Sequence, residues 1–215
     1  MATLSFRLLV PKGRKIAVKQ HVRDLPQAET ILSDGTRELV WKERNSAAVR
    51  ENFAAPGWYE QYPWIEMSEW KSWNEVKDWG RSIFREPESN NGAVEREWKQ
   101  LMAERGSEMT REEKLVVALK FVQDVIRYFG IEIGVNSHRP RSPDEVLESR
   151  FGDCKDKALL FCQMARLAGW DAYPVLVNSS EGKSLEGWLP SPRAFDHVIA
   201  RVRGGGSLLW FDPTI

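Results

Sequence analysis

The hydrophobic pattern of the chain changes its period twice, and this succession limits the fold more than any other feature. Residues 1 to about 45 alternate between apolar and polar side chains as strands do, and Asp34-Gly35 between two such runs is a strong hairpin signal. The middle of the chain carries apolar residues at helical spacing, and residues 171–215 alternate again. Strands, then helices, then strands predict an α+β fold with antiparallel sheets.

Sequence signals at the helix ends locate three predicted helices. The first is expected to begin at Ser72, where Glu75 three residues later completes a capping box. The second covers residues 110–129 and has the clearest amphipathic pattern, and the third begins at Asp153 or Cys154 and stops at Gly169. The other expected elements are a short helix from Ser142 or Pro143 to Ser149, strands over 171–179, 195–203 and 207–214, and a turn at Gly204–Gly206.

Charge and length exclude several classes of protein. Lys plus Arg and Asp plus Glu number 31 each, so no net charge favours nucleic acid or an anionic membrane, and no apolar run approaches the roughly 18 residues of a membrane helix. The first residues lack the features of a secretory signal. A chain that opens in a strand pattern and stops at "WFDPTI" is interpreted as a piece of a longer protein, so its compartment and oligomeric state are not readable.

The most unusual residue is Cys154, which stands in the charged stretch "RFGDCKDKA", residues 150–158. Free cysteine usually packs in apolar company. At a helix N-terminus its thiolate would face unpaired backbone N–H groups, which lower the pKa of the thiol and make the nucleophile available. Lys155 and Lys157 favour the thiolate, whereas the two neighbouring aspartates oppose it, so the decisive question is whether a base lies nearby.

His197 is the best candidate among the three histidines for that base. It lies near the start of a predicted strand, and Asp212 ends the next strand 15 residues later. A glycine-rich hairpin would place the two side by side, as an imidazole and its orienting carboxylate require. His21 lies in the remote N-terminal segment, and we favour a structural role for His138.

The second cysteine, Cys162, lies eight residues after Cys154 on one helix, a distance of roughly 12 Å that no disulfide bridges. Its apolar neighbours predict core packing. A zinc site built from both cysteines and His197 would lack the closely spaced cysteine pairs of structural zinc, so no metal is predicted. No cofactor motif is expected either. For the tryptophan-rich stretch 52–79 we favour core packing between two parts of the chain over a stacking surface for sugar or nucleic acid.

The block at residues 127–179, followed in order by "FDHVIARV" and "WFDPT", resembles the bacterial transglutaminase-like core, a papain-like cysteine-enzyme superfamily. The resemblance extends from near Trp58 to the end of the chain. It implies a helix that carries the cysteine at its N-terminus and packs on an antiparallel sheet. We therefore expect residues 51–215 to be this core, truncated at its C-terminus, and residues 1–50 to be the end of the β domain that commonly precedes it.

The same resemblance implies Cys154 as nucleophile, His197 as base and then acid, and Asp212 as the group that orients His197. Such enzymes form a thioester from a protein or peptide amide, and water or an amine resolves it. The Cys154 N–H would meet the oxyanion. Tyr128 is the weak candidate for a second donor, and that donor is left open. Hydrolysis, as a peptidase or amidase, is favoured over acyl transfer.

Two further expectations concern the binding partners and the cellular location of the protein. The partner is a protein or peptide substrate, with no nucleic acid and no membrane span, and the resemblance suggests the periplasm or cell envelope. The alternative function is a catalytically silent transglutaminase-like module that binds or scaffolds. Rapid alkylation of Cys154 relative to Cys162 would distinguish an active thiol from a silent one.

Overall fold

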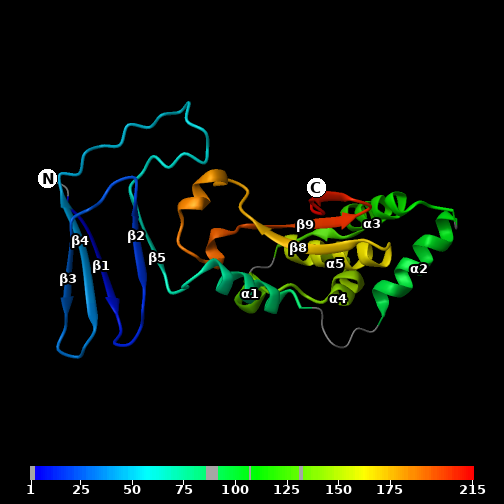
Figure 1. The fold of residues 1–215 in the computed structure, drawn as a ribbon, viewed down its shortest axis with the longest axis horizontal. Coiled ribbons are helices and arrows are strands. Elements are labelled where there is room, and N and C mark those ends of the chain that lie inside the picture. Colours follow the sequence, from blue (N-terminus) through cyan, green and yellow to red (C-terminus); the bar gives the residue numbers. More distant parts are fainter. Residues whose placement is uncertain (1–2, 86–91, 107, 131–132) are drawn as a thin grey trace. The chain divides into compact units, whose positions relative to one another are not determined.

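The computed structural model describes residues 3–85, 92–106, 108–130 and 133–215, and Figure 1 shows their elements. The strands are β1 (Thr3–Val10), β2 (Ala17–His21), β3 (Gln27–Ile31), β4 (Arg37–Arg44), β5 (Trp64–Ser68), β6 (Arg127–Tyr128), β7 (Phe151–Gly152), β8 (Asp171–Val177), β9 (His197–Gly204) and β10 (Ser207–Phe211). The helices are α1 (Trp73–Ile83), α2 (Ala93–Arg105), α3 (Arg111–Val125), α4 (Pro143–Ser149) and α5 (Cys154–Leu167).

The chain forms two compact units. The first contains Met1–Asp78 and Asn178–Ala194, and the second contains Trp79–Val177 and Phe195–Ile215. The connection from β8 to β9 therefore belongs to the first unit, although both strands belong to the second. The division into domains at residue 50 stays a prediction, because compactness alone does not define where a domain begins.

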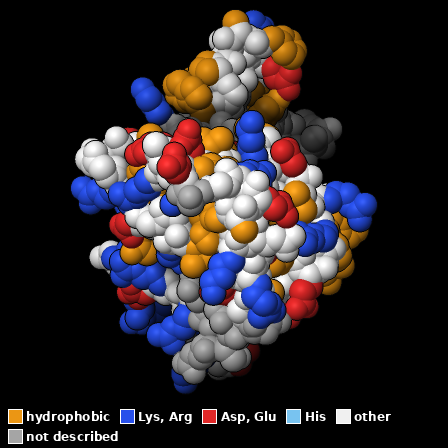
Figure 2. Space-filling model, turned by 90° about the vertical axis from the view of Figure 1, so that its right-hand side faces the viewer, with side chains coloured by type: hydrophobic (Ala, Val, Ile, Leu, Met, Phe, Trp, Pro, Cys, Tyr) orange, Lys and Arg blue, Asp and Glu red, His pale blue; other side chains and the backbone are white. Residues whose placement is uncertain are grey.

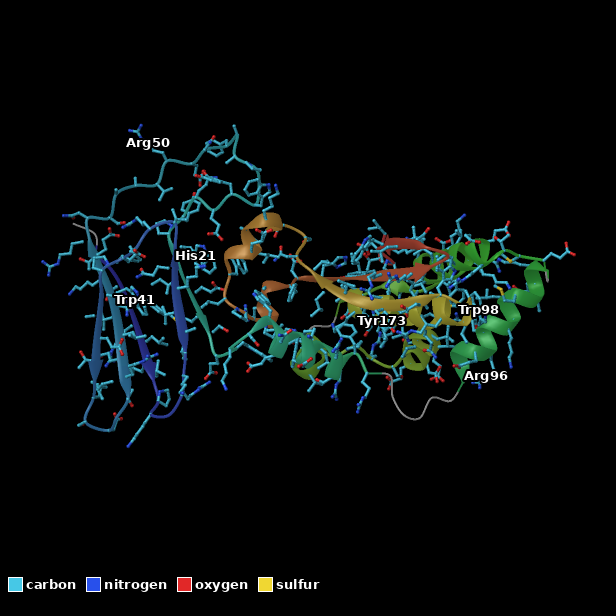
Figure 3. The ribbon with its side chains drawn as sticks, viewed as in Figure 1. His21, Trp41, Arg50, Arg96, Trp98 and Tyr173 are labelled. Carbon is cyan, nitrogen blue, oxygen red and sulfur yellow. The ribbon has the colours of Figure 1, made fainter. Side chains whose placement is uncertain are left out.

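The first unit is built from antiparallel strands. β1, β4 and β3 form one sheet in that order, and β2 pairs with β5 in a separate ladder. Leu39 and Trp41 alternate along β4 and are buried with Leu25, and Figure 3 labels Trp41 within this part of the ribbon. The predicted hairpin is confirmed: Gly35 has φ +83°, and the Thr36 N–H donates to Asp34.

The second unit packs helices on a three-stranded antiparallel sheet ordered β10-β9-β8. α5 contacts both β8 and β9, and α2, α3 and α4 each contact α5 (Figure 1). Small residues of the sheet, Ala172 and Ala200, are fully buried against the core that Phe161 and Met164 of α5 also enter. The expected cysteine-bearing helix on an antiparallel sheet is therefore present.

Capping explains where the helices of this unit begin. Thr110, Ser142 and Asp153 each accept a backbone N–H from the first turn, and each helix has a carboxylate at the third position that accepts in return. Ser72 likewise accepts the Glu75 N–H before α1. The starts predicted from these caps are confirmed.

Several elements differ from the sequence-based expectation. The second expected helix ends at Val125 rather than near residue 129, because Arg127 and Tyr128 pair with β7. Neither α2 nor β5 was expected. The tryptophans of residues 52–79 are not core residues: none is buried, and Trp58 is 41% exposed.

The surface carries both signs of charge. Figure 2 shows one face on which Lys and Arg side chains lie among Asp and Glu side chains, with smaller hydrophobic areas between them. None of the helices in the described ranges has the length and apolar content that a bilayer span needs.

Candidate active site

Cys154 is the first residue of α5, and its side chain is only 6% exposed. It packs with Ala158 one turn further along the helix and with Val198 on β9, and Phe84 and Leu176 lie against this group. The thiol accepts hydrogen bonds from the backbone of Val198 and of Lys155. The cysteine therefore lies at the junction between the helix N-terminus and the strand that begins at His197.

Burial raises the pKa of the Cys154 thiol above its ordinary value, and the charge of Asp153 acts in the same direction. Lys155 and the two backbone hydrogen bonds oppose this rise without cancelling it. Part of the effect of Lys155 is lost because its ammonium is paired with the Asp153 carboxylate, with both side chains buried. The predicted low pKa is wrong for this arrangement, because loss of water and the charge of Asp153 outweigh Lys155 and the two backbone hydrogen bonds.

His197 and Asp212 are brought together as the sequence predicts. The Nε2 of His197 lies 2.7 Å from Oδ2 of Asp212, since β9 and β10 pair antiparallel and Asp212 directly follows β10. Burial pushes the pKa of Asp212 upward, but hydrogen bonds from Thr214 and His197 outweigh it and the pKa is lowered. The carboxylate is therefore ionised near neutrality, so Nε2 is the protonated donor and Nδ1 is left as an acceptor.

Two further residues hold Asp212 in place, and sequence reasoning missed them. Thr214 donates its N–H and its hydroxyl to Oδ1, at 2.9 and 2.6 Å. Gln123 of α3 donates to the Asp212 carbonyl at 3.1 Å. The "DPT" sequence carried the signal for Thr214, because an aspartate commonly accepts from the backbone two residues later.

Lys157 connects α5, to which it belongs, with Ile126, the residue that follows α3. Its side chain is 1% exposed, and its Nζ donates to the Ile126 carbonyl at 2.7 Å. Burial lowers the pKa of Lys157, while the charges of Asp212 and Asp124 act in the opposite direction. The charge of Asp212 therefore favours the protonated form of this buried lysine.

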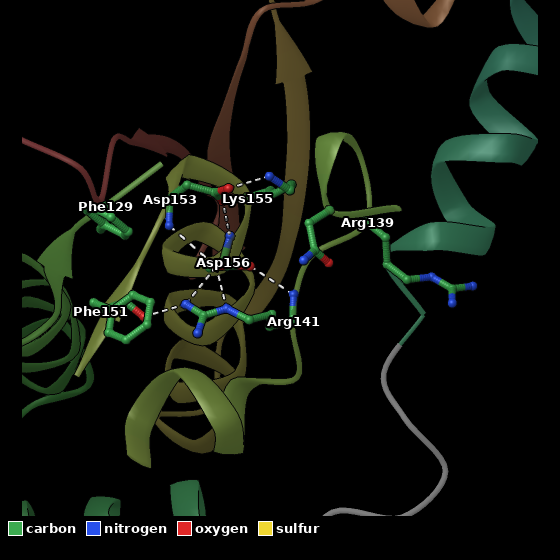
Figure 4. A pocket seen from close by; sticks show the side chains of 8 residues that line it. Phe129, Arg139, Arg141, Phe151, Asp153, Lys155 and Asp156 are labelled. Carbon is green, nitrogen blue, oxygen red and sulfur yellow. Dashed lines mark hydrogen bonds and ion pairs between the residues drawn. The ribbon is translucent and has the colours of Figure 1, made fainter. Parts of the chain in front are cut away.

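Asp156 fixes the start of α5 through Arg141, another residue that sequence reasoning missed. Arg141 donates its N–H to Oδ1 at 2.8 Å and its Nε to Oδ2 at 3.0 Å, and its guanidinium lies over the Phe151 ring (Figure 4). Gly152 is needed for this packing. A Cβ there would lie 2.8 Å from Asp156 Cβ and 3.2 Å from Val146 Cγ1.

A small pocket opens beside this framework, with a volume of about 80 Å³. Phe129 and Phe151 supply its aromatic walls, and Asp153 and Lys155 on either side of Cys154 reach it. Figure 4 shows Arg141 directed toward Asp156, whereas the Arg139 side chain points away from this group. The pocket therefore presents aromatic faces next to the helix N-terminus that carries the thiol.

The other sequence candidates lie elsewhere. His21 is in the first unit, where its Nε2 lies 2.8 Å from Glu66. His138 is exposed and meets the edge of the Trp79 ring at 5.3 Å. Cys162 is fully buried in the main core, which confirms its expected role. Within the described ranges, no three His, Cys, Asp or Glu side chains are grouped as a metal site would require.

The pairing of β6 with β7 brings the Tyr128 backbone near the segment that precedes Cys154. β6 runs parallel to β7, which sets Tyr128 opposite Gly152, and the Phe129 N–H donates to the Gly152 carbonyl at 2.9 Å. The Tyr128 side chain is 49% exposed. This register brings a hydroxyl-bearing residue beside the turn that precedes Cys154.

Comparison with known proteins shows the family to which the chain is related. A family model described as the transglutaminase-like superfamily matches residues 99–210, just over half of the chain. The match includes Cys154 and His197 and ends two residues before Asp212. Comparison with curated proteins gives no match.

Two solved structures are similar. One, described as a "putative protease" from Parabacteroides distasonis, has a TM-score of 0.75 at 18% identity, and the match covers 97% of this chain but only 39% of that one. The other, described as a "putative cysteine protease" from Cytophaga hutchinsonii, has a TM-score of 0.44 at 14% identity and covers 100% and 72% of the two chains. The first likeness shows a shared α+β fold across nearly the whole chain.

Proposed function

The chain belongs to the transglutaminase-like superfamily, and we propose that it is a thiol enzyme that cleaves protein or peptide amide bonds through a thioester on Cys154. The observation that carries the proposal is the 2.7 Å contact between His197 and Asp212 at the start of β9, next to the residue whose backbone contacts the thiol. Thiol catalysis requires an oriented imidazole near a cysteine, and the contact of the thiol with Val198, the neighbour of His197, supports this arrangement.

The first step transfers the thiol proton to Nδ1 of His197 while sulfur attacks the carbonyl carbon of the amide. Asp212 accepts from Nε2, so it holds the ring in the tautomer with a free Nδ1 and stabilises the imidazolium that forms. Because burial raises the pKa of the thiol, the resting cysteine is neutral, and the base creates the nucleophile only as attack proceeds.

The tetrahedral intermediate collapses when His197 returns its proton to the leaving nitrogen. The products are a thioester and either ammonia, from a glutamine side chain, or a new amino terminus, from a peptide bond. Water then loses a proton to His197 and attacks the thioester, and the released sulfur recovers that proton. An amine in place of water would give acyl transfer, and hydrolysis is favoured because water is the more abundant nucleophile.

The oxyanion needs donors at the carbonyl oxygen. The Cys154 backbone N–H is one, at the end of a helix where the N–H groups are directed outward. We propose Tyr128 as the second, which the β6 and β7 register supports by setting its backbone opposite Gly152. Tyr128→Phe should then lower turnover by about 10²-fold with little change in stability, which steady-state kinetics and a urea titration would measure together.

The test offers a glutamine-containing peptide pool with and without a labelled primary amine. Ammonia or new amino termini should appear with the parent protein and with Cys162→Ala, and should be absent with Cys154→Ala. Amine incorporation that outruns hydrolysis would assign the transferase reaction. No product of either kind, with Cys154→Ala indistinguishable from the parent, would refute catalysis.

That last outcome would favour a second candidate function, a binding module on the same fold. One observation supports it: the thiol is nearly buried and its pKa is raised rather than lowered. The substrate class and the cell-envelope location belong to the proposed enzyme function and follow from the family resemblance. The expectation of no nucleic-acid partner follows from the balance of charge.

A further inference from the structure

The first unit contains a cavity that the proposed reaction does not use. It has a volume of about 430 Å³, within the range of pockets that hold small ligands. All of its lining residues belong to the first unit, either to the stretch that ends at Trp64, the first residue of β5, or to the connection between β8 and β9. The lining side chains that matter here are Tyr59, Tyr62, Trp64, Trp188, Glu60 and Glu181.

The aromatic rings form a corner rather than a flat platform. The rings of Trp64 and Trp188 meet edge to face, with centroids 5.2 Å apart and planes at 67°. His21 stacks on Trp64 with centroids 4.0 Å apart and planes at 5°, so one face of that indole is already covered. Tyr59 and Tyr62 are about half exposed at the same cavity. Rings at steep angles surround a compact group, whereas a sugar stacks on one open flat face.

The rim of the cavity is acidic. Glu181 and Glu60 line it, and Tyr62 donates its hydroxyl to Glu51. Glu60 is held in position, because it accepts from the Trp188 indole N–H at 2.9 Å and faces His21 at 3.6 Å. No Lys or Arg lines the cavity in the described part of the chain. Lys19 donates to the carbonyl of Gly187, the residue before Trp188.

We propose that this aromatic and acidic cavity binds an organic cation, an alkylammonium or guanidinium group. Aromatic faces attract cations through their quadrupole, and nearby carboxylates add to the attraction. The volume greatly exceeds the roughly 30 Å³ of a water molecule, so it suits an organic group rather than a bare ion. The cation comes either from the lysine or arginine side chain of a peptide or from a free quaternary ammonium compound.

The experiment follows the indole N–H signals of Trp188 and Trp64 by NMR during titration of the whole chain. Choline, Nα-acetyl-lysine amide and Nα-acetyl-arginine amide are the cationic probes. 3,3-Dimethyl-1-butanol is the neutral isostere of choline, and cellobiose tests whether the cavity binds a sugar instead. The cations should give saturable shifts with dissociation constants on the order of 1 mM. Tighter binding of the amino-acid amides would identify a peptide source, and tighter binding of choline a quaternary ammonium source.

Two variants test the two parts of the site. Tyr59→Ala removes an aromatic wall, and Glu181→Gln removes a charge without changing shape, so each should weaken the binding by about two- to fivefold. Trp210→Ala removes an exposed aromatic residue of β10 in the second unit and should leave the binding unchanged. Because Glu181→Gln preserves volume, it decides the matter even if Tyr59→Ala folds poorly.

Several results would overturn the proposal. They are the absence of saturable shifts up to about 10 mM cation, equal shifts with the neutral isostere, binding of cellobiose in place of the cations, and full binding by the Glu181→Gln variant. Loss of amidase activity in Cys154→Ala has no bearing on this site, so the two proposals fail or succeed separately.

Discussion

Replacing Gly152 with alanine tests whether the turn before Cys154 is held by close packing. The new Cβ would lie 2.8 Å from Asp156 Cβ, and Cβ atoms essentially never approach so closely. Asp156 Cβ is attached directly to the α5 backbone, so the contact is relieved only by moving the first turn of the helix. That turn carries Cys154 and the capping box of Asp153 and Asp156.

The expected cost is that of overpacking a filled site, about 1–3 kcal/mol of the free energy of unfolding. With a urea dependence of about 2 kcal/mol per molar, the unfolding midpoint should fall by about 0.5–1.5 M. Cys162 reports this unfolding directly, because its side chain is fully buried and reacts with iodoacetamide only when the second unit opens. Trypsin cuts after Lys155 and Lys157, so the two cysteines fall in separate peptides for mass spectrometry.

Gly130→Ala is the matched control, since a Cβ there meets nothing within 4 Å and its φ is not positive. Its midpoint should equal that of the parent. Equal midpoints for Gly152→Ala and Gly130→Ala would refute the reasoning, because they would mean that the start of α5 accommodates the added methyl without cost.

Three other predictions concern charge. The alkylation rate of Cys154 should rise with pH through a midpoint above the ordinary thiol value of about 8.5, because burial raises the pKa; a midpoint near neutrality would contradict this. Arg141→Met should destabilise the protein by about 3–5 kcal/mol in a urea titration, because it leaves the buried Asp156 carboxylate unpaired, whereas Arg139→Met should change little. Because the pKa of Asp212 is lowered in the folded protein, the stability that Asp212 contributes is present above the unfolded pKa of about 3.8 and is lost as pH falls below it. The difference in urea midpoint between the parent and Asp212→Asn should therefore disappear in acid. A difference that stays constant with pH would contradict a stabilising role for the ionised Asp212.

The parts of the fold that sequence predicted well are those set by local chemistry. Capping residues located the starts of α3, α4 and α5, and the glycines after residue 203 located the turn between β9 and β10. α2 was missed because its N-cap, Gly92, has a left-handed backbone and no side-chain cap. The spacing of Val94, Trp98 and Leu101 on one face was the signal that remained for it.

In the candidate site, too, the features set by local sequence were predicted and those set by distant residues were not. The pairing of His197 with Asp212 followed from two strands and a hairpin, which are local features. The pKa of Cys154 did not, because the effect of burial depends on Val198, Phe84 and Leu176, which are distant in sequence. Pattern reasoning also gave no reason to place Asn178–Ala194 with the first unit, since that assignment depends on tertiary contacts such as Ser68 with the Pro190 carbonyl.

The most direct test of the central claim is mass spectrometry of the tryptic peptides after the protein is mixed with an acyl donor, such as a glutamine-containing peptide, and quenched in acid. The account predicts an acyl group on the Cys154 peptide of the parent and of Cys162→Ala, its disappearance in His197→Ala, and a reduced amount in Asp212→Asn. An acyl group formed equally well in His197→Ala, or found on Cys162 instead, would contradict it.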